Sequence, residues 1–442
     1  MTFEELNLTK PLLSALTDLG YKTPTTIQEK VFSVMMSGKD VCGIAQTGTG
    51  KTFAYLLPSL RQIVFAKDRL PQLLIIVPTR ELVVQVVDEV KKLSAYMTLE
   101  TVGLYGGGNI KVQRAELKQG ADVVVATPGR LVDLAMDGSL KTKSIKKLVI
   151  DEVDEMLNLG FRTQLKNILD LLPQKRQNLL FSATITQEVE QLMQTYFNNP
   201  VRIEAAPVGT PLDNIEQVAY EVPNFYTKVN LLDLLLDENP DMSKVLIFVA
   251  TKKLADQLFN QLELGYLNRI GVIHSNKEQN HRFNSVKQFH EGTYRILIAT
   301  DIIARGLDVA EVSHVINFDI PEIPENYIHR IGRTGRADKK GKAISFITGK
   351  DQEFKEAIEE LMQYEIPMQT LPENVKISEI LTPDEEPKIN MKNIDVKLPK
   401  RESVGAAFHQ KIPKNLKVNV RRDHAAEKMQ KYGRPIKRSG KK

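Results

Sequence analysis

The sequence predicts an α/β protein with two parallel-sheet domains in tandem and a basic C-terminal tail. Three observations predict this fold class. Short β-branched runs alternate with amphipathic stretches up to about residue 200, the alternation restarts after a segment with Pro and Gly at 205–217, and it fails after about residue 370. Strands that alternate with helices form mostly parallel sheets. A segment without a sustained apolar period is expected to be disordered or to fold only on binding.

The expected strands are short apolar runs that lie between helical patterns. In the first domain the expected strands include 41–45, 73–77, 101–105, 123–127 and 147–151. In the second domain they are 244–251, 269–274, 295–300, 314–319 and 343–348. One expected helix, at 80–93, has a core face made of Leu82, Val86, Val90 and Leu93. The predicted boundaries are 1–207 for the first domain, 208–370 for the second and 371–442 for the tail.

The composition is that of a soluble globular protein. The chain has 442 residues, of which 42% are hydrophobic and 26% are charged. Its single cysteine, Cys42, excludes an intramolecular disulfide and a Cys-rich zinc site, which fits a reducing compartment. The N-terminus lacks the basic start of a signal peptide, and no apolar run approaches the ~18 residues of a membrane span. We therefore expect a cytoplasmic protein without a membrane partner.

Charge is unevenly distributed along the chain. Residues 400–442 contain 14 Lys or Arg and 3 Asp or Glu, whereas the rest of the chain contains 46 basic and 52 acidic side chains. An acidic body with a cationic arm is typical of proteins that bind nucleic acid. The alternative is a tail that only improves solubility.

A phosphate-binding loop follows the first expected strand. Residues 45–52, AQTGTGKT, lie between a strand and a helix, which is the context of a nucleotide site. Gly48 and Gly50 let backbone N–H groups surround phosphate oxygens. Lys51 supplies a positive charge near the β- and γ-phosphates, and Thr52 can bind Mg²⁺.

Two acids end another strand of the same domain. In KLVIDEVD, Asp151 and Glu152 directly follow the hydrophobic run. One acid there can hold a metal ion through its water shell while its neighbour orients the water that attacks the γ-phosphate. Without the phosphate loop upstream, the same pair would indicate a solvated turn.

Adenine is the favoured base. The guanine-recognition pattern N-K-x-D of GTPases is missing, because residues 276–279 are Asn-Lys-Glu-Gln and lie in the second domain. Gln28 precedes the strand of the phosphate loop, and a side-chain amide can pair with N6 and N7 of adenine. Considered alone, a Gln on a helix is usually a surface residue.

The chain resembles one family from residue 3 to about residue 370. Phe3 lies 17 residues before Gly20, and ten motifs follow in the order AQTGTGKT, PTREL, GG, TPGR, DEVD, SAT, IFVAT, QNHR, ATDIIARGLDV and HRIGRTGR. In this order they resemble the DEAD-box ATP-dependent RNA helicases, nearest to the bacterial RhlE-like group. The resemblance implies two RecA-like domains. Val153 replaces the family's Ala within DEVD, where we expect it to point into the sheet packing and to remove no catalytic group.

The resemblance implies an ATP site divided between the two domains, with ATP and Mg²⁺ as cofactors. The implied catalytic residues are Lys51, Asp151, Glu152, Arg333 and Arg336, the two arginines acting as fingers from the second domain. The implied nucleotide contacts are Phe3, Gln28, Thr47, Gly48, Thr49, Gly50, Lys51, Thr52 and Asp308. Thr52 and Asp151 would hold Mg²⁺, partly through water. The residues implied to couple the site to domain closure are Asp154, Ser182, Thr184 and His329.

The resemblance also implies that RNA binds the opposite rim of the cleft. The implied RNA contacts are Thr79, Arg80, Gly107, Thr127, Gly129, Arg130, Gln279, Arg282 and Thr300. Small polar side chains, backbone amides and Arg suit phosphates and 2′-hydroxyls, so we expect binding that is independent of base sequence. The basic tail is expected to hold structured RNA. Proteins of ribosome assembly or RNA decay are candidate partners.

Three functions stay open at this point. The chain could be an RNA helicase that locally separates short duplexes, a DNA helicase or translocase of the same superfamily, or a non-catalytic, ATP-gated RNA clamp. Gln28 together with PTREL and TPGR favours RNA over DNA, because the family that carries these motifs acts on RNA. The intact set of catalytic residues disfavours the clamp.

Overall fold

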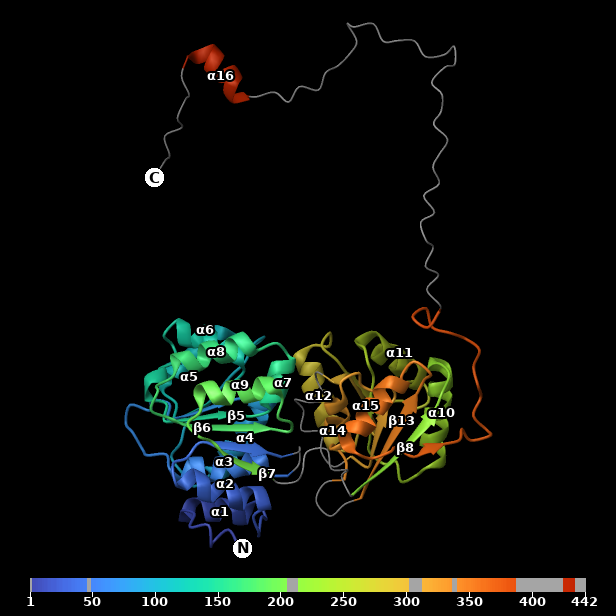
Figure 1. Ribbon diagram of the computed structural model, residues 1–442, viewed down its shortest axis with the longest axis horizontal. Coiled ribbons are helices and arrows are strands. Elements are labelled where there is room, and N and C mark those ends of the chain that lie inside the picture. The colour runs from blue at the N-terminus through green and yellow to red at the C-terminus, as the bar shows by residue number, and fades with distance from the viewer. Residues whose placement is uncertain are drawn as a thin grey trace. The chain divides into compact units, whose positions relative to one another are not determined.

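The computed structural model of the chain describes residues 2–45, 49–204, 214–301, 312–335, 340–386 and 424–433. The chain divides into a compact unit, Met1–Glu386, and a second unit, Pro387–Lys442. Within the compact unit the described residues form two seven-stranded sheets with helices between the strands (Figure 1). We call residues 2–204 the first lobe and residues 214–386 the second lobe. The predicted domain boundary at 207/208 lies outside the described residues.

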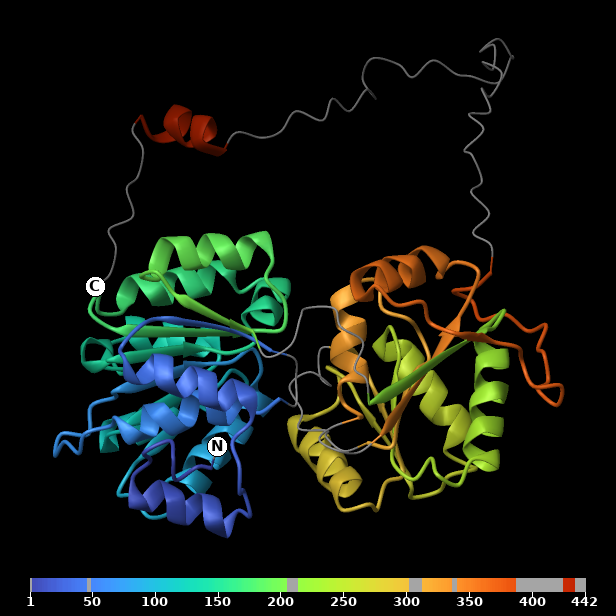
Figure 2. The ribbon, with the colours of Figure 1, turned by 60° about the horizontal axis from the view of Figure 1, so that its bottom comes forward.

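The first lobe is a parallel sheet with the strand order β3-β4-β2-β5-β6-β1-β7 and helices on both of its faces (Figure 2). Its strands are β1 (Val41–Ile44), β2 (Leu73–Ile76), β3 (Thr101–Leu104), β4 (Val123–Ala126), β5 (Lys147–Ile150), β6 (Gln177–Ser182) and β7 (Val201–Glu204). Its α-helices are α1 (Lys10–Asp18), α2 (Thr26–Met36), α3 (Lys51–Arg61), α4 (Arg80–Leu93), α5 (Ile110–Gln119), α6 (Pro128–Met136), α7 (Val153–Asn158), α8 (Arg162–Leu171) and α9 (Gln187–Tyr196).

The second lobe has the strand order β10-β11-β9-β12-β13-β8-β14. Its strands are β8 (Ile215–Glu221), β9 (Val245–Phe248), β10 (Ile270–Ile273), β11 (Ile296–Ala299), β12 (His314–Asn317), β13 (Gly341–Ile347) and β14 (Met368–Gln369). Its helices are α10 (Phe225–Glu238), α11 (Lys252–Leu262), α12 (Gln279–His290), α14 (Pro324–Ile331) and α15 (Gln352–Met362). Each strand of this lobe takes the place of the strand numbered seven lower in the first lobe. The two lobes therefore share one RecA-like topology, although their sequences are not close repeats.

Strand β2 illustrates why these runs form central strands. Leu73 and Ile75 lie in one apolar core of the first lobe, and Leu74 and Ile76 lie in the other. All four are fully buried, because helices cover both faces of the sheet. A run without polar residues is therefore the pattern that this position requires.

The helix expected at 80–93 is α4, and its core face differs by one residue from the prediction. Val86, Val90 and Leu93 are buried as expected, but Val83 is fully buried and Leu82 is only partly so. Thr79 caps the helix shortly after β2, so the first helical residue is Arg80. The position of this first turn turns Val83, and not Leu82, towards the sheet.

Residues 371–386, which the sequence placed in the tail, belong to the compact unit. We call them the strap. Asn224 Nδ2 donates to the carbonyl of Ser378 at 2.6 Å, and the Ser378 N–H donates to Thr227 Oγ1 at 2.9 Å. Polar side chains of α10 thus bind the backbone of the strap, which an apolar period cannot reveal. The compact chain ends at Glu386 and not at about residue 370.

In the second unit, the described residues contain helix α16 (His424–Tyr432). No helix in the described parts of the chain combines the length and apolar character needed to cross a membrane.

Candidate functional site

Helix α3 follows β1 after residues 45–50 and presents Lys51 at its first turn. Gly50 precedes it with a φ of 88°, in the left-handed region that favours glycine. The Lys51 side chain is buried, and its Nζ has no hydrogen-bond partner among the described residues. A buried, unpaired ammonium next to a helix N-terminus suits an anion such as a phosphate. The predicted contacts Thr47 and Gly48 lie outside the described residues.

Gln28 lies against this loop and is buried. Its Oε1 accepts from the Thr25 N–H at 2.9 Å, and its Nε2 donates to the carbonyl of Gly50 at 3.2 Å. Thr25 Oγ1 donates to the carbonyl of Thr49 at 3.0 Å. A Cβ on Gly50 would lie 2.5 Å from Gln28 Nε2, so any other residue at this position would displace the Gln28 side chain. Gln28 therefore supports the loop, a role that sequence reasoning missed. Phe3 is buried in the core of the first lobe.

The two acids lie at the carboxyl end of β5. Glu152 has a left-handed backbone with a φ of 52°, and its N–H donates to Asp151 Oδ1 at 3.0 Å. Burial raises the pKa of Asp151, and it raises the pKa of Glu152 to about 7, although Lys51 opposes both shifts. Glu152 Oε2 has no hydrogen-bond partner among the described residues. Desolvated carboxyl groups of this kind suit a cation or a proton transfer.

Tyr55 is a further residue of this site that the sequence reasoning did not single out. It is fully buried on α3, one turn after Lys51. Burial, and then the neighbouring Asp151 carboxylate, raise the pKa of its hydroxyl well above the usual value. The signal for Tyr55 was its spacing of four residues from Lys51, which places it on the same helix face.

Three predicted coupling residues lie together between α7 and β6. Asp154 Oδ2 accepts from the N–H groups of Ala183 and Thr184, each at 3.0 Å, and from Thr184 Oγ1 at 3.1 Å. Ser182 Oγ donates to the Thr184 carbonyl at 2.6 Å. Val153 is fully buried in the adjacent core. The DEVD and SAT motifs are therefore one hydrogen-bonded unit.

The second lobe contributes charges from the end of α14. His329 Nδ1 lies 2.9 Å from Glu155 Oε1, and both side chains are buried. The Arg333 guanidinium opposes the rise in the pKa of Glu152, which indicates that its charge acts on this acid. Arg336 and Asp308 lie outside the described residues. Glu155 is a second residue that sequence reasoning missed, although it directly follows DEVD.

The six predicted RNA contacts of the first lobe lie past the ends of β2, β3 and β4. Thr79 Oγ1 accepts from the Leu82 N–H, and a Cβ on Gly107 would lie 2.7 Å from Arg80 Nη1. Arg130 donates to Gln113 Oε1 at 2.7 Å and to the Gly108 carbonyl at 3.2 Å. Thr127 and Gly129 belong to the start of α6, and a Cβ on Gly129 would meet open space.

The predicted RNA contacts of the second lobe have different surroundings. Arg282 is buried, and its Nη1 lies 3.1 Å from Glu81 Oε1 of the first lobe. Burial lowers the pKa of Arg282, and Glu81 opposes this shift. Thr300 is mostly buried at the end of β11. Gln279 is the first residue of α12, and its side chain is not among those that the structure describes. Arg282 therefore joins the two lobes in this structure.

Comparisons with known proteins give a consistent result. A family model described as DEAD/DEAH box helicase matches residues 25–192, and one described as Helicase conserved C-terminal domain matches residues 227–338. The chain is 40% identical over 365 residues to the ATP-dependent RNA helicase DbpA of Bacillus subtilis, covering 82% of this chain and 75% of that protein. It is 40% identical over 354 residues to the DEAD-box ATP-dependent RNA helicase CshA of Geobacillus kaustophilus, covering 79% and 74%.

Solved structures give the same picture. Dbp5 of S. cerevisiae bound to RNA and ADP BeF3 matches with a TM-score of 0.76 and 31% identity, covering 84% of this chain and 95% of that one. Mss116p bound to ssRNA and AMP-PNP matches with a TM-score of 0.76 and 27% identity, covering 84% and 78%.

Proposed function

The chain belongs to the DEAD-box family of ATP-dependent RNA helicases, and from this premise we propose that it couples ATP hydrolysis to the local separation of RNA duplexes. The observation that carries the proposal is the divided site. Lys51 and Glu152 of the first lobe each have a buried polar atom without a hydrogen-bond partner among the described residues. Arg333, of the second lobe, acts electrostatically on Glu152.

ATP is the nucleotide, and its phosphates bind at the start of α3. Thr47, Gly48, Thr49 and Gly50 supply backbone contacts, Lys51 pairs with the β- and γ-phosphates, Phe3 and Gln28 border the base, and Asp308 contacts the ribose. The unpaired Lys51 Nζ supports this assignment. The bonds of Gln28 to Thr25 and Gly50 link base recognition to the shape of the loop.

Thr52 and Asp151 would hold Mg²⁺, partly through water. When bound there, the ion would supply positive charge that neutralises the phosphates and the transferred group. The desolvated Asp151 carboxyl, whose pKa is raised by burial, supports a cation at this place. Tyr55, buried beside Asp151, helps to exclude bulk water from the acid.

Glu152 acts as the base that orients the attacking water. A general base works best when its pKa is near the working pH, and that of Glu152 is about 7. Arg333 and Arg336 act as fingers that stabilise charge on the transferred phosphoryl group. Asp154, Ser182, Thr184 and His329 transmit the state of the site, because they join DEVD to SAT and to α14.

RNA binds through its backbone at the edge formed by Thr79, Arg80, Gly107, Thr127, Gly129 and Arg130, with Gln279, Arg282 and Thr300 from the second lobe. The open space beside Gly129 leaves room for a phosphate or ribose. Small side chains and backbone amides suit sequence-independent binding and contact with 2′-hydroxyls. Arg282 is bonded to Glu81 of the first lobe. It therefore contributes to RNA binding in one of two ways: it breaks this ion pair to contact RNA directly, or it keeps the pair and holds the two lobes together.

We assign ATP binding to residues 1–207 and the fingers to residues 208–370, extended by the strap. The basic tail adds contacts with structured RNA. The RhlE-like subgroup, a cytoplasmic location, and partners in ribosome assembly or RNA decay stay predictions.

Paired assays test the proposal. ATP hydrolysis is measured with and without uridine homopolymer RNA, and strand release is measured on a short RNA duplex and on a DNA duplex of the same sequence. We expect RNA to stimulate hydrolysis and ATP to drive release of the RNA strand. Equal activity on DNA would favour the DNA helicase, and RNA binding that depends on ATP without hydrolysis would favour the clamp.

A further inference from the structure

The second lobe repeats the architecture of the nucleotide site without a phosphate loop. Helix α10 follows β8 as α3 follows β1, since the two strands hold the same place in their sheets. The registers Ile76↔Ile150 and Phe248↔Asn317 make the residues after β12 equivalent to those after β5. By this equivalence, Phe318 and Asp319 stand where the first lobe has Asp151 and Glu152.

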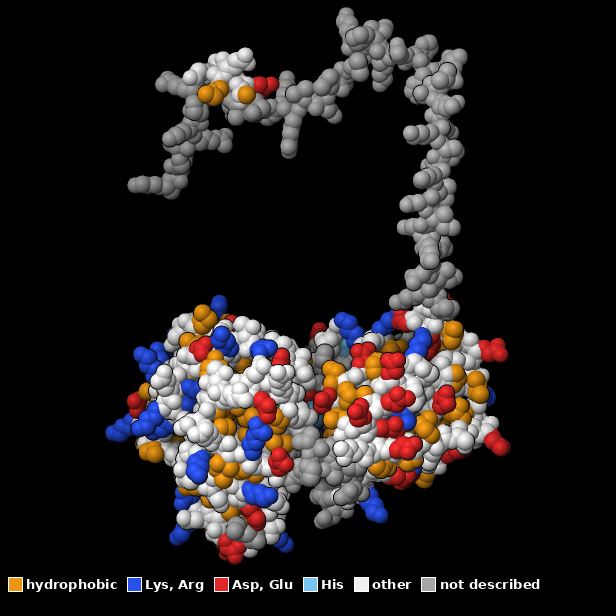
Figure 3. Space-filling model, viewed as in Figure 1, with side chains coloured by type: hydrophobic (Ala, Val, Ile, Leu, Met, Phe, Trp, Pro, Cys, Tyr) orange, Lys and Arg blue, Asp and Glu red, His pale blue; other side chains and the backbone are white. Residues whose placement is uncertain are grey.

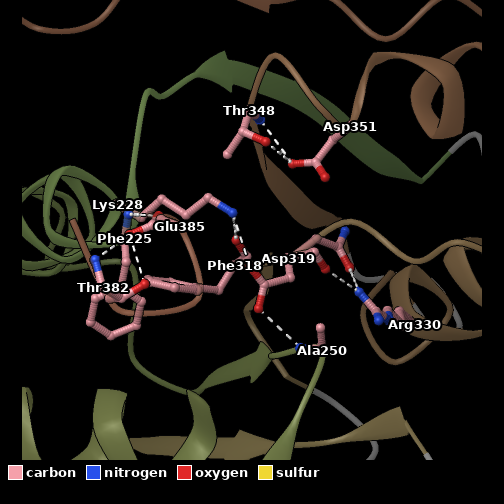
Figure 4. Close-up of polar contacts among 11 residues, drawn as sticks. Phe225, Lys228, Ala250, Phe318, Asp319, Arg330, Thr348, Asp351, Thr382 and Glu385 are labelled. Atoms are coloured by element: carbon pink, nitrogen blue, oxygen red, sulfur yellow. Dashed lines mark hydrogen bonds and ion pairs between the residues drawn. The ribbon is translucent and has the colours of Figure 1, made fainter. Parts of the chain in front are cut away.

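A lysine of α10, Lys228, contacts Phe318 and Asp319. Lys228 Nζ donates to the Phe318 carbonyl at 2.7 Å and to Asp319 Oδ1 at 2.9 Å (Figure 4). The Lys228 side chain is 5% exposed and that of Asp319 is 18% exposed. In the first lobe, Lys51 Nζ has no hydrogen-bond partner among the described residues, whereas here the ammonium is hydrogen-bonded to a carboxylate.

A carboxylate of the strap occupies the N-terminus of α10. Glu385 Oε1 accepts from the N–H of Phe225, the first residue of the helix, at 2.7 Å. Its Oε2 accepts from the Thr382 N–H and Oγ1, each at 2.8 Å. An anion at a helix N-terminus is favourable, and a phosphate takes such a place in nucleotide sites. In the second lobe the carboxylate of Glu385 takes the place that a phosphate has in such sites.

Asp319 joins this filled site to α14. Its Oδ2 accepts from the Ala250 N–H at 3.0 Å, and its carbonyl accepts from Arg330 Nη1 at 2.6 Å (Figure 4). Arg330 is almost fully buried and also donates to both carboxylate oxygens of Asp301, at 2.6 and 2.7 Å. Its neighbour His329 and the nearby Arg333 are the residues directed at the acids of the first lobe.

We propose that Lys228 and Asp319 are a positioning pair for ATP hydrolysis, and that Glu385 of the strap supports the pair by binding the first N–H of α10. The pair fixes the Asp319 carbonyl, this carbonyl fixes Arg330, and Arg330 fixes the end of α14, where His329 lies and after which Arg333 follows. This inference rests on the proposed function, because the reaction concerned is ATP hydrolysis. According to this inference, the site around Lys228 and Asp319 in the second lobe aligns His329 and Arg333 with the acids of the first lobe.

The test uses the full chain with Mg-ATP and saturating uridine homopolymer RNA. Lys228→Gln is expected to lower kcat about tenfold, because small displacements of an aligned group are costly, and to change the KM for ATP by less than about twofold. Lys228→Arg keeps the charge and is expected to recover part of the rate. Asp384→Asn is the matched control, since Asp384 neighbours Glu385 but forms an exposed pair with Lys253. A kcat for Lys228→Gln equal to that of the control would overturn the inference.

A second measurement does not depend on activity. The chain contains no tryptophan, and Ile323, which caps α14, is 44% exposed, so Ile323→Trp gives a single reporter. In this background Lys228→Gln is expected to lower the fluorescence anisotropy and to raise quenching by acrylamide, and Asp384→Asn is not. An unchanged reporter would overturn the inference even if the unaltered protein hydrolyses ATP. A changed reporter in a protein that lacks RNA-stimulated hydrolysis would overturn the proposed function alone.

Circular dichroism establishes that each variant is folded. If Lys228→Gln does not fold, Asp319→Asn replaces it, because the amide keeps the shape and the bond to Ala250. The expected kcat and reporter changes have the same direction and are smaller. No change in either would overturn the inference.

Discussion

The two lobes share one topology but differ in the polar contacts at equivalent edges of their sheets. In the first lobe, Lys51 and Glu152 have buried polar atoms without a partner among the described residues, and burial raises the pKa of the acid to about 7. In the second lobe, Lys228 bonds to Asp319, and Glu385 occupies the helix N-terminus. Under the proposed function, the unpaired polar atoms, and not the topology, distinguish the sheet edge that binds the nucleotide.

The lobes also differ in charge. Residues 1–204 contain 24 basic and 22 acidic side chains, and residues 214–386 contain 19 and 28. Asp and Glu side chains are frequent on the face of the second lobe seen in Figure 3. Long-range attraction for RNA is therefore weak over the second lobe, although this lobe carries the two arginines that we propose as fingers.

The largest expected effect separates binding from catalysis. Arg333→Ala should lower RNA-stimulated kcat by about 10³-fold, because an arginine finger acts on the transition state, and should change the KM for ATP little. Lys51→Ala should instead raise the Kd for ATP about tenfold or more, since it removes a charged hydrogen bond to the phosphates. Steady-state kinetics and equilibrium titration with a fluorescent ATP analogue measure the two quantities.

The first lobe alone provides the control for this comparison. Residues 1–207 should bind ATP and fail to show RNA-stimulated hydrolysis. Full activity of this fragment, or a loss of ATP affinity in Arg333→Ala as large as that in Lys51→Ala, would contradict the division of roles between the lobes.

The next effect concerns Glu152. Glu152→Gln should keep ATP and RNA binding and lower kcat by about 10²-fold or more. The base acts when it is ionised, and its pKa is about 7, so kcat/KM of the unaltered protein should rise from pH 6 and level off about one unit above that value. The magnesium complex of ATP is used throughout, so that ionisation of free ATP does not contribute. A flat profile would exclude Glu152 as the group that titrates.

The same substitution should stabilise the fold. The pKa of Glu152 is higher in the folded state than its ordinary value of 4.5, so ionisation costs stability as the pH rises from 4.5 to about 7. Glu152→Gln has no such cost, and its midpoint of thermal unfolding should exceed that of the unaltered protein at pH 8 by a few degrees. The difference should shrink towards pH 4.5. An equal difference at every pH would point to packing instead.

A smaller effect is expected at Gln28. Gln28→Ala should reduce the preference for ATP over GTP about tenfold, the size of a bidentate base contact. Thr25→Val is the matched control, because it removes the hydroxyl that bonds to the Thr49 carbonyl and caps α2 but keeps the Gln28 amide. If both variants lower the affinity for ATP and GTP equally, Gln28 shapes the loop and does not recognise the base.

The sequence predicted the elements of the site better than their partners. Lys51 could be placed because it lies in the phosphate loop that follows one apolar strand, and Asp151 because it directly follows another. Parallel strands bring their carboxyl ends to one edge. The ion pairs of Arg282 with Glu81 and of His329 with Glu155 join residues far apart in the chain, and each residue alone fits a solvated surface.

The strap could not be predicted from periodicity. Glu385 and Thr382 act through single hydrogen bonds, and the segment has no regular apolar spacing. The resemblance predicted two RecA-like domains, and the equivalent strand orders confirm them. The place of Lys228 could not be predicted, because it lies three residues into α10 whereas Lys51 begins α3. Only the order of the strands shows that the two lysines serve equivalent places.

The smallest expected effect concerns the tail, which offsets the acidity of the second lobe. Removal of the residues after Glu386 keeps the strap and should leave the maximal ATPase rate unchanged. The RNA concentration for half-stimulation should rise, and the log–log salt slope of RNA binding should fall in magnitude by ~0.7 for each phosphate that the shortened protein no longer neutralises. A chain of full length with the 14 Lys and Arg of 400–442 replaced by Gln separates charge from length, and it should behave like the truncated protein. If both proteins kept the RNA affinity and the salt slope of the unaltered protein, the lobes alone would account for RNA binding. The tail would then not compensate for the acidity of the second lobe.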